Sequence, residues 1–404
     1  MAKVLICWEL GANLGHVTRQ VPVAARLREA GHEVLFAVRE LANASAVLGR
    51  RGFRFVQAPI HAGRVRFPRP PVNYSELLLA EGYGMPSALL SQVSAWHSLF
   101  DLFGAEAVIV DHAPTALLAA HARDLPRVQV ACGFAVPPAT NPFPRIRPSK
   151  NVSDAQLAKS DEIVSRSINA CLARLPGARP IGHVSDLFRA APACLATFAE
   201  IDHYGAREDT EYAGALFGAA EGPRVQWKSK DDAHVFAYLQ NGTAGLKNML
   251  TALGRSRAEV ICAIPGIPER TARELSRRRL RVLHHPVPLQ TLLEDAQVVL
   301  CHGGSGTSAQ ALLNGVPLMA LPASIEQLLQ ARCYQRMGAG IAVGSKRTVE
   351  ILSSALDKLL TESTYSEKAA AFASKYRGFK PARAADQAVA LVERELGARR
   401  AAVN

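Results

Sequence analysis

Apolar residues occur along this chain in short runs, separated by segments in which apolar positions repeat with helical spacing. The run Val4–Trp8 leads through a turn, Gly11–Gly15, into helical spacing over Val17–Ala30. The next run, Glu33–Val38, follows after a Gly-His pair. This order predicts a strand, a helix and a second strand parallel to the first. Later runs that fit strands of the same sheet are Phe53–Gln57, Ala107–Val110 and Val128–Ala131.

A second series with the same alternation begins beyond a charged segment that contains glycine and proline. Its predicted strands are Val235–Gln240, Glu259–Ala263, Arg281–His284, Val298–Cys301 and Leu318–Leu321. A chain of 404 residues is too long for one ordinary core, so two domains are expected. We predict an α/β fold class with two Rossmann-like, doubly wound domains, residues 1–220 and 234–382, and a linker at 221–233. The amphipathic remainder, 383–404, is expected to be helical.

The overall composition is that of a soluble globular protein, with 49% apolar and 20% charged residues. No window of 18 apolar residues predicts a membrane span, and the opening apolar run is too short for a signal peptide. The seven cysteines show no CxxC spacing. We therefore expect a cytoplasmic protein with reduced cysteines in its core.

The formal net charge is +12, and a basic surface can attract nucleic acid, an anionic membrane or a phosphorylated substrate. The basic residues are dispersed, with short clusters at 64–69, 277–279 and 399–400. No zinc-ligand spacing or nucleic-acid-binding motif accompanies them. Nucleic acid is therefore not an expected partner, whereas peripheral contact with an anionic membrane stays open.

A glycine-rich turn, His302–Thr307, follows the predicted strand Val298–Cys301 and precedes a helix expected to start near Thr307. Backbone N–H groups at a helix N-terminus, together with the helix dipole, bind anions. Beyond the next strand comes a polar pair, Glu326 and Gln327. The pattern predicts a diphosphate site with a hydroxyl-binding pair beside it. The alternative is a turn whose glycines only permit tight packing.

A histidine and an aspartate follow two strands of the first domain. His16 lies in the turn after the first strand, and Asp111 ends the strand Ala107–Val110. Imidazole is a suitable base near neutral pH, and a carboxylate can fix its tautomer. We predict a His16–Asp111 pair at one rim of the sheet. The alternatives are a histidine that caps a turn and an aspartate that caps the helix expected near Pro114.

Together these motifs resemble the GT-B glycosyltransferases, the family that holds the UDP-glycosyltransferases of the macrolide and flavonoid type. The resemblance is strong over 235–345, good over 1–40 and 105–135, and faint in between. It implies two domains that face each other across a cleft, with the last helix crossing back onto the first domain. The donor-binding residues that it implies are Gly15, Gly242, Thr243, Val287, Gln290, His302, Gly304, Ser305, Gly306, Thr307, Gln310, Glu326 and Gln327.

The resemblance also implies an activity. A sugar would pass with inversion, and without a metal, from a nucleoside-diphosphate sugar to a hydroxyl of a small-molecule or lipid-linked acceptor. His16 would be the base, Asp111 would hold it, and no cofactor beyond the sugar nucleotide would be needed. Gln310 stands where many relatives have a ribose-binding glutamate, and residues 286–290 contain no aromatic for the base. The nucleotide is therefore open between UDP, dTDP and GDP.

Two loops rich in proline, 59–75 and 133–150, are the expected acceptor region. The aromatic candidates are Phe67, Tyr83 and Phe134, with Tyr74 and Phe143 beside them, and the candidates for an anionic group are Arg64, Arg66 and Arg69. Core or surface packing is an equal alternative for each. Two alternative functions also stay open: a nucleotide-sugar epimerase or hydrolase, and a helper subunit without catalysis.

Overall fold

The computed structural model describes residues 1–12, 14–61, 63, 65, 67, 69–148, 151–208, 210–218 and 222–403. These form two compact units. The first unit contains Met1–Ala199, Ala206–Gly218 and Lys380–Asn404, and the second contains Glu200–Gly205 and Ala219–Phe379. The first unit differs from the expected first domain, 1–220, chiefly at residues 200–205, which pack with the second unit. Their contacts with the helix over 325–337 explain this, as described below.

The sheet of the first unit has six parallel strands in the order β3-β2-β1-β4-β5-β6. Its strands are β1 (Lys3–Cys7), β2 (Glu33–Val38), β3 (Arg54–Gln57), β4 (Ala107–Val110), β5 (Arg127–Ala131) and β6 (Ala193–Leu195). The strand order reverses between β1 and β4. In open α/β sheets, ligands bind at the carboxyl ends of the two strands that flank such a reversal.

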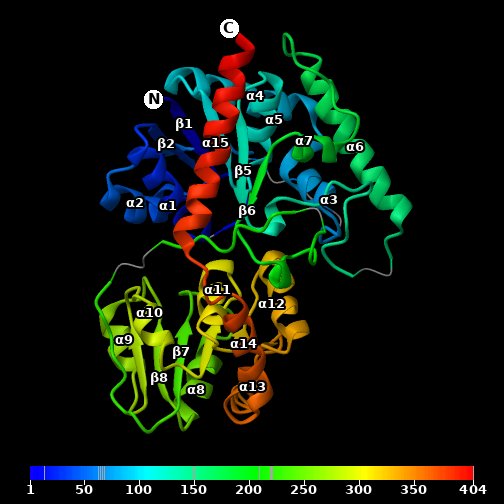
Figure 1. The fold of residues 1–404 in the computed structure, drawn as a ribbon. Helices are drawn as coiled ribbons and strands as arrows, with labels where there is room; N and C mark the ends of the chain where they lie inside the picture. The colour runs from blue at the N-terminus through cyan, green and yellow to red at the C-terminus, as the bar shows by residue number, and fades with distance from the viewer. Residues whose placement is uncertain are drawn as a thin grey trace. The chain divides into compact units, whose positions relative to one another are not determined.

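Helices cover both faces of this sheet (Figure 1). They are α1 (Gly15–Glu29), α2 (Leu41–Leu48), α3 (Tyr74–Leu78), α4 (Pro86–Phe103), α5 (Pro114–Ala122), α6 (Asp154–Leu172), α7 (Val184–Arg189) and α15 (Pro381–Val403). Successive side chains of strand β1 point to opposite faces of the sheet, and both faces are buried. Val4 and Ile6 pack with α1 and α15, whereas Leu5 and Cys7 pack with α4, α5 and α6.

Helix α15 belongs to the first unit although it follows the whole second unit in the chain. Its buried residues Ala384, Ala388, Val392 and Leu396 recur every four positions, so they form one apolar face. That face contacts α1, β4, β5 and β6. Figure 1 shows the helix lying along the sheet. One face of the first sheet is therefore covered by a segment from the far end of the sequence.

The second unit repeats the architecture, with six parallel strands in the order β12-β11-β10-β7-β8-β9. Its strands are β7 (His234–Tyr238), β8 (Glu259–Ala263), β9 (Leu280–Leu283), β10 (Val298–Cys301), β11 (Leu318–Ala320) and β12 (Gly340–Ala342). Its helices are α8 (Leu246–Arg255), α9 (Glu269–Leu275), α10 (Gln290–Leu293), α11 (Ser305–Leu313), α12 (Ile325–Met337), α13 (Val349–Thr361) and α14 (Ser363–Lys375). The order reverses between β7 and β10. The predicted class, two doubly wound Rossmann-like domains, is confirmed.

Two further features concern the chain as a whole. All seven cysteines are buried and none forms a disulfide. Among the described residues, no helix is both long and apolar enough to cross a membrane.

Candidate active site

The predicted histidine and aspartate lie at the strand reversal of the first unit. His16 is the second residue of α1, which follows β1, and Asp111 comes directly after β4. Because β1 and β4 are adjacent and parallel, their carboxyl ends share one edge of the sheet. The His16 Nδ1 atom lies 3.1 Å from Asp111 Oδ1, and the two side chains are only 4% and 0% exposed. The structure therefore brings these two residues together in a buried pair.

Two further residues of α1 bind the same carboxylate. Arg19 Nη1 lies 3.0 and 2.8 Å from the two Asp111 oxygens. Gln20 Nε2 donates to Asp111 Oδ2 at 3.2 Å and to the carbonyl of Val130 at 2.6 Å. Sequence reasoning missed both residues. Their spacing of three and four positions from His16 places them on the same helix face, which is the signal that could have found them.

Asp111 is ionised at neutral pH. Burial by itself raises its pKa, but the charges of Arg19 and His16 and the hydrogen bonds of His16 and Gln20 outweigh burial and lower it to about 2. An ionised carboxylate only accepts hydrogen bonds, so the proton of a neutral His16 sits on Nδ1. The other ring nitrogen, Nε2, is then unprotonated and can act as a base.

The alternative role for Asp111, as the cap of the helix near Pro114, is wrong, because Glu9 fills that role. The Glu9 carboxylate accepts the backbone N–H groups of Thr115 and Ala116, at 3.0 and 2.5 Å, in the first turn of α5. Burial raises the pKa of Glu9 to about 8, although these two hydrogen bonds oppose the rise. Glu9 thus accepts the first-turn N–H groups of α5, and Asp111 instead binds side chains of α1.

Gly11 keeps the Nε2 edge of His16 accessible. It has a φ of +84°, and an added Cβ would lie 2.6 Å from His16 Nε2 and 3.2 Å from His112 Nδ1. The indole of Trp8 stacks on the imidazole with ring centres 5.3 Å apart. His112 itself has a φ of 51°, a conformation that costs a non-glycine residue about 1–2 kcal/mol. Its carbonyl accepts the N–H of Leu10 at 2.9 Å, which ties together the loops after β1 and β4.

In the second unit, His302 joins the loops that follow β7 and β10. Its Nδ1 lies 3.1 Å from the Leu321 carbonyl, and its Nε2 accepts the backbone N–H of Gln240 at 3.2 Å. The Thr243 hydroxyl lies 3.1 Å from the same Nε2. A carbonyl only accepts and an N–H only donates, so His302 is neutral with its proton on Nδ1. Burial lowers the pKa of His302, which agrees with this state.

The glycine-rich turn opens α11 at Ser305, two residues before the expected start. Ser305, Gly306 and Thr307 form the first turn of α11, at the end of a helix that favours anions, and the diphosphate contact expected of them stays a prediction. An added Cβ at Gly304 or Gly306 would meet no described atom within 4 Å. At Gly303, with a φ of +84°, an added Cβ would lie 3.2 Å from the Gln327 carbonyl. Here the backbone passes close to α12.

The polar pair lies in the first turn of α12. The Gln327 backbone N–H is capped by Ser324 Oγ at 3.3 Å, and the Gln327 side-chain oxygen accepts the N–H of Ala323 at 2.8 Å. The amide NH₂ of Gln327 is the group that it can offer to a sugar. The Glu326 carboxylate lies within 4.8 Å of a ring nitrogen of His203. Sequence reasoning missed His203, which comes from the 200–205 segment.

That segment is held on α12 itself. Gln330 Nε2 donates to the Ile201 carbonyl at 2.7 Å, and Cys333 Sγ lies 3.3 Å from the Asp202 carbonyl. These contacts explain why 200–205 belongs to the second unit.

Arg347 is a further missed residue beside the donor loops. It follows β12 and donates to the carbonyls of Ala244 at 3.2 Å, Pro322 at 2.7 Å and Gly344 at 3.1 Å. It thereby ties the loop after β7 to the loop after β11. It also places a positive charge near His302, whose pKa that charge helps to lower.

The remaining predicted donor residues differ in what they can offer. The side chain of Val287 is 1% exposed, so a contact with a base would come from its main chain. Gln290 is exposed at the start of α10. Gln310 Nε2 donates to the Gly306 carbonyl at 3.3 Å, which places this amide beside the glycine-rich turn. Gly242 has a φ of +86° in the loop that Thr243 joins to His302.

Sequence comparisons connect this geometry with known proteins. Residues 247–391 match the family model described as the erythromycin biosynthesis protein CIII-like C-terminal domain. A PGL/p-HBAD biosynthesis rhamnosyltransferase from Mycobacterium bovis is 27% identical over 169 residues, 41% of this chain and 37% of the relative. Aklavinone 7-beta-L-rhodosaminyltransferase from Streptomyces galilaeus is 37% identical over 92 residues, 22% of this chain and 20% of the relative. The chain thus aligns with well under half of the length of these relatives.

Solved structures match over nearly the whole chain. The spinosyn rhamnosyltransferase SpnG has a TM-score of 0.67 at 18% identity, with 96% of this chain and 99% of SpnG covered. The glycosyltransferase VinC in complex with DTDP has a TM-score of 0.68 at 16% identity, with 97% of this chain and 100% of VinC covered. The chain has the GT-B fold. The resemblance to family 1 GT-B glycosyltransferases that its motifs indicated is confirmed.

Three of the aromatic acceptor candidates in this GT-B protein are core residues instead. Phe134, Tyr74 and Phe143 are 2%, 0% and 1% exposed. Tyr74 lies edge-on to both of the others, with ring centres 6.3 and 5.9 Å away. Their rings pack against one another in the core, and the acceptor contact expected of Phe134 stays a prediction.

Tyr83 is the exception among the buried aromatics. Its hydroxyl lies 3.0 Å from Thr115 Oγ1, and the residue lines a small cavity with Glu9, His61 and Glu81. Burial raises its pKa well above the usual value, so the hydroxyl stays protonated. The cavity places Tyr83 close to the loop after β1.

Of the proposed anion-binding arginines, only Arg69 lies among the described residues, and the acceptor contact expected of Phe67 stays a prediction. Arg69 pairs with the buried Glu76, with Nη1 2.5 Å from Oε2, so its charge is already used within the chain. Its guanidinium also lies 5.9 Å from the ring of Phe67, which is half-buried. Arg64 and Arg66 lie outside the described residues.

Proposed function

We propose that this chain is an inverting glycosyltransferase that moves a sugar from a dTDP-sugar to a hydroxyl acceptor. The observation that carries the proposal is the His16–Asp111 contact of 3.1 Å, in which an ionised carboxylate fixes the proton of His16 on Nδ1. This leaves Nε2 to take a proton. A GT-B fold and relatives named as glycosyltransferases support the same assignment.

In the proposed reaction, His16 Nε2 removes the proton of the acceptor hydroxyl as its oxygen attacks the anomeric carbon. Attack on the face opposite the leaving diphosphate inverts the configuration. Asp111 stabilises the imidazolium that forms, as a buried carboxylate does in hydrolase triads. General-base catalysis of this kind contributes about 10²–10⁴-fold to a rate.

The departing diphosphate would be held by the second unit. Residues 305–307 open α11, so their N–H groups lie at the positive end of a helix, and preformed donors stabilise charge that develops in a transition state. Arg347 adds a positive charge on the neighbouring loops after β7 and β11. This donor set supports transfer that requires neither a metal ion nor a cofactor beyond the sugar nucleotide, which we include in the proposal.

A thymidine nucleotide fits Gln310 better than a ribonucleotide does. An amide grips a ribose diol less strongly than a glutamate, because charge-assisted hydrogen bonds are about twice as strong as neutral ones. A deoxyribose lacks the 2′-hydroxyl, so replacing glutamate by glutamine costs a deoxyribonucleotide less binding energy than it costs a ribonucleotide. The structural neighbours VinC, in complex with DTDP, and SpnG, complexed with thymidine diphosphate, support this choice.

For the acceptor we propose a small polyketide or phenolic aglycone. The support is the printed names of relatives: one acts in PGL/p-HBAD biosynthesis, one is an aklavinone glycosyltransferase, and SpnG has been solved with spinosyn aglycone.

The proposal is tested in two stages. Thermal unfolding is first measured with dTDP, UDP and GDP. A nucleotide at about 100 times its Kd should stabilise the protein by about 2.7 kcal/mol, and dTDP is expected to give the largest shift. The protein is then incubated with dTDP-sugars and a panel of polyketide and phenol acceptors, and glycosylated product is detected by mass.

The variant His16→Ala should keep the dTDP shift and lose transfer. Near wild-type transfer by this variant would refute the base assignment. Incubation of donor without acceptor separates the alternative enzymes, because an epimerised or rapidly hydrolysed donor would favour the epimerase or hydrolase. A protein that binds nucleotide but transfers no sugar, and that purifies with a stable partner chain, would favour a helper subunit.

A further inference from the structure

A groove in the second unit combines an apolar floor with a basic rim, and no donor-site residue contributes to it. It encloses about 850 Å³ and lies between α8 and the segment that links α9 to β9. The residues that line it, called the basic groove from here on, are Leu246, Lys247, Leu250, Thr251, Gly254, Arg255, Leu275, Arg277, Arg278, Arg279 and Leu280.

The floor of the basic groove is continuous with the core of the second unit. Leu250 and Leu280 are buried members of that core, and Leu246 and Leu275 pack against it while staying partly exposed. Leu246 and Leu250 are four positions apart, so they lie on one face of α8. An apolar surface of this kind gains by contact with hydrocarbon.

The rim carries positive charge from two sides. Lys247 and Arg255 are exposed residues of α8, and Arg277 and Arg278 are exposed residues of the facing segment. The Leu280 N–H donates to the Arg277 carbonyl at 3.2 Å, which closes a turn with Arg278 and Arg279 at its tip.

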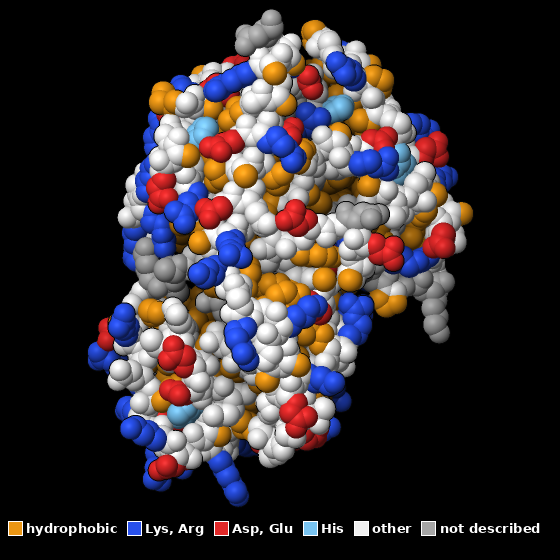
Figure 2. Space-filling view, in the orientation of Figure 1, with side chains coloured by type: hydrophobic (Ala, Val, Ile, Leu, Met, Phe, Trp, Pro, Cys, Tyr) orange, Lys and Arg blue, Asp and Glu red, His pale blue; other side chains and the backbone are white. Residues whose placement is uncertain are grey.

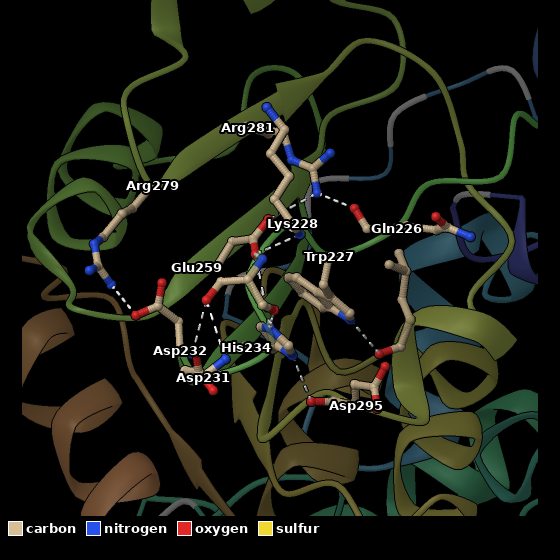
Figure 3. A network of polar contacts seen from close by, with 12 residues as sticks. Gln226, Trp227, Lys228, Asp231, Asp232, His234, Glu259, Arg279, Arg281 and Asp295 are labelled. Carbon is tan, nitrogen blue, oxygen red and sulfur yellow. Dashed lines mark hydrogen bonds and ion pairs between the residues drawn. The ribbon is translucent and has the colours of Figure 1, made fainter.

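A network of polar contacts fixes the base of this turn (Figure 3). Arg279 Nη1 reaches Asp232 at 2.7 Å, and Arg281 Nη2 reaches Glu259 at 3.0 Å. Glu259 also accepts the backbone N–H of Lys228 at 2.9 Å. Figure 3 shows the side chains of Arg279 and Arg281 directed towards these two carboxylates. Arg279 is therefore neutralised by a partner, while the turn is held in place.

The other rim cations form no ion pair within the described residues. In the part of the chain that the structure describes, Lys247, Arg277 and Arg278 have no carboxylate within ion-pair distance, and Arg255 has none either, although its charge helps to lower the pKa of Glu350. Arg277 uses part of its guanidinium on the carbonyls of Glu274 and Ser276, at 2.6 and 2.9 Å, and keeps its charge. Both basic and acidic side chains are visible on the molecular surface (Figure 2), whereas Lys247, Arg277 and Arg278 place three positive charges without ion-pair partners among the described residues around one groove.

We propose that the basic groove docks this protein on an anionic phospholipid membrane. Headgroup phosphates would lie on Lys247, Arg277 and Arg278, and the first acyl carbons would lie on the leucines of the floor. The positive rim matches the anionic head of a phospholipid, and the apolar floor matches its hydrocarbon. Neither feature alone would distinguish a phospholipid from other anionic or apolar ligands. Binding to a bilayer surface by apolar contact plus attraction to anionic lipid is an established mode for soluble proteins.

Nucleic acid and acidic peptide fit the basic groove less well. None of its eleven described lining residues is aromatic, so it offers no platform on which bases could stack. Apart from the cations, its only polar side chain is Thr251, whose hydroxyl already donates to the Lys247 carbonyl at 2.8 Å. A peptide backbone would find few hydrogen-bond partners there.

The first test is co-sedimentation of the full chain with large vesicles of phosphatidylcholine alone and with 30% phosphatidylglycerol, at 0.1 M salt. Binding is expected only to the anionic vesicles. Each basic residue near an anionic surface strengthens binding about fivefold, so the double variant R277Q/R278Q should bind about 25-fold more weakly. The matched control is R270Q/R273Q, which removes two exposed arginines of α9 that pair with Glu274 and Glu269 and do not line the groove. It should bind within about twofold of wild type.

A second pair of variants tests whether the anionic lipid occupies the interior of the basic groove. Thr251→Glu places a negative charge inside the basic groove, and Thr251→Gln changes the same side chain without charge. The glutamate variant should lose binding to anionic vesicles, whereas the glutamine variant should retain it. Both should keep the thermal shift with dTDP, because α8 lies outside the donor residues and the proposal does not depend on the proposed activity.

Three results would overturn the proposal. Equal weakening by R277Q/R278Q and R270Q/R273Q would show that only net charge matters. Equal binding to vesicles with and without phosphatidylglycerol would remove the role of the cations. Loss of duplex DNA binding by R277Q/R278Q, with vesicle binding unchanged, would make the groove a nucleic-acid site.

Discussion

Replacing Gly11 with alanine tests whether the Nε2 edge of His16 is the place where a proton is taken. The new Cβ would lie 2.6 Å from Nε2, whereas ordinary contacts of this kind begin at 3.4 Å. The imidazole would therefore have to retreat by about 0.8 Å. Its hydrogen bond to Asp111, 3.1 Å long, is on the opposite side of the ring and would be distorted by that movement.

The cost to the reaction follows from this displacement. A misplacement of about 1 Å at a reacting group can lower a rate by about 100-fold. We expect kcat of Gly11→Ala to fall by about that factor, with little change in affinity for dTDP, since all the predicted donor residues except Gly15 belong to the second unit. The alanine also adopts a φ of +84°, which costs about 1–2 kcal/mol of stability.

Gly31→Ala provides the matched control. Gly31 has a φ of +83°, but an added Cβ would meet no described atom within 4 Å. Backbone strain is thus the same in the two variants, and only Gly11→Ala adds a clash with His16. Rates are measured as glycosylated product formed per minute, and stability is measured by urea unfolding. If both variants lose similar stability and both keep wild-type kcat, the reasoning about Nε2 is wrong.

Three other substitutions test separate parts of the site. Asp111→Asn should lower the free energy of unfolding by about 3–5 kcal/mol, because it leaves the buried Arg19 guanidinium without a counter-charge. In the wild type, the pKa of Asp111 is held at about 2 rather than 3.8, which contributes about 2.4 kcal/mol to the free energy of unfolding. This contribution is present above about pH 4 and is lost as the pH falls towards 2. Urea unfolding should show this pH dependence in the wild type and a weaker one in the variant. Gln310→Glu should tighten UDP about tenfold relative to dTDP in calorimetric titrations, and an unchanged ratio would place Gln310 away from the ribose. Arg347→Met should weaken dTDP by about 10–100-fold while Arg336→Met does not, and equal effects of the two would count against a role for Arg347 at the donor loops.

The sequence was sufficient to predict the bounds of strands with long apolar runs, and it was insufficient to predict the short edge strands. Strands β2, β4, β8 and β10 were predicted at their observed bounds, because four or more successive apolar or alternating residues carry a clear period. Strands β6 and β12 have three residues each and lie at the edges of their sheets, whereas the equally short β11 was predicted because its apolar run continues to Leu321. The start of α11 was misplaced by two residues because the glycines that open it carry no helical signal.

The site was predictable where topology alone brings residues together. His16 and Asp111 meet because they follow adjacent parallel strands, and that adjacency follows from the βαβ order. Glu9 was not predictable as the cap of α5, since it lies 106 positions from the N–H of Thr115 that it accepts. Arg347 likewise binds carbonyls of three separate loops, and no local pattern encodes such a set of partners.

The position of α15 has a consequence for how the protein matures on the ribosome. The face of the first sheet that includes Val4 and Ile6 receives Ala384, Ala388 and Val392 only after the entire second unit has been translated. Until then a strip of apolar surface on the nascent polypeptide stays open to solvent and to chaperones. Truncation before α15 would therefore damage the half that holds His16, although the break lies beyond the other half.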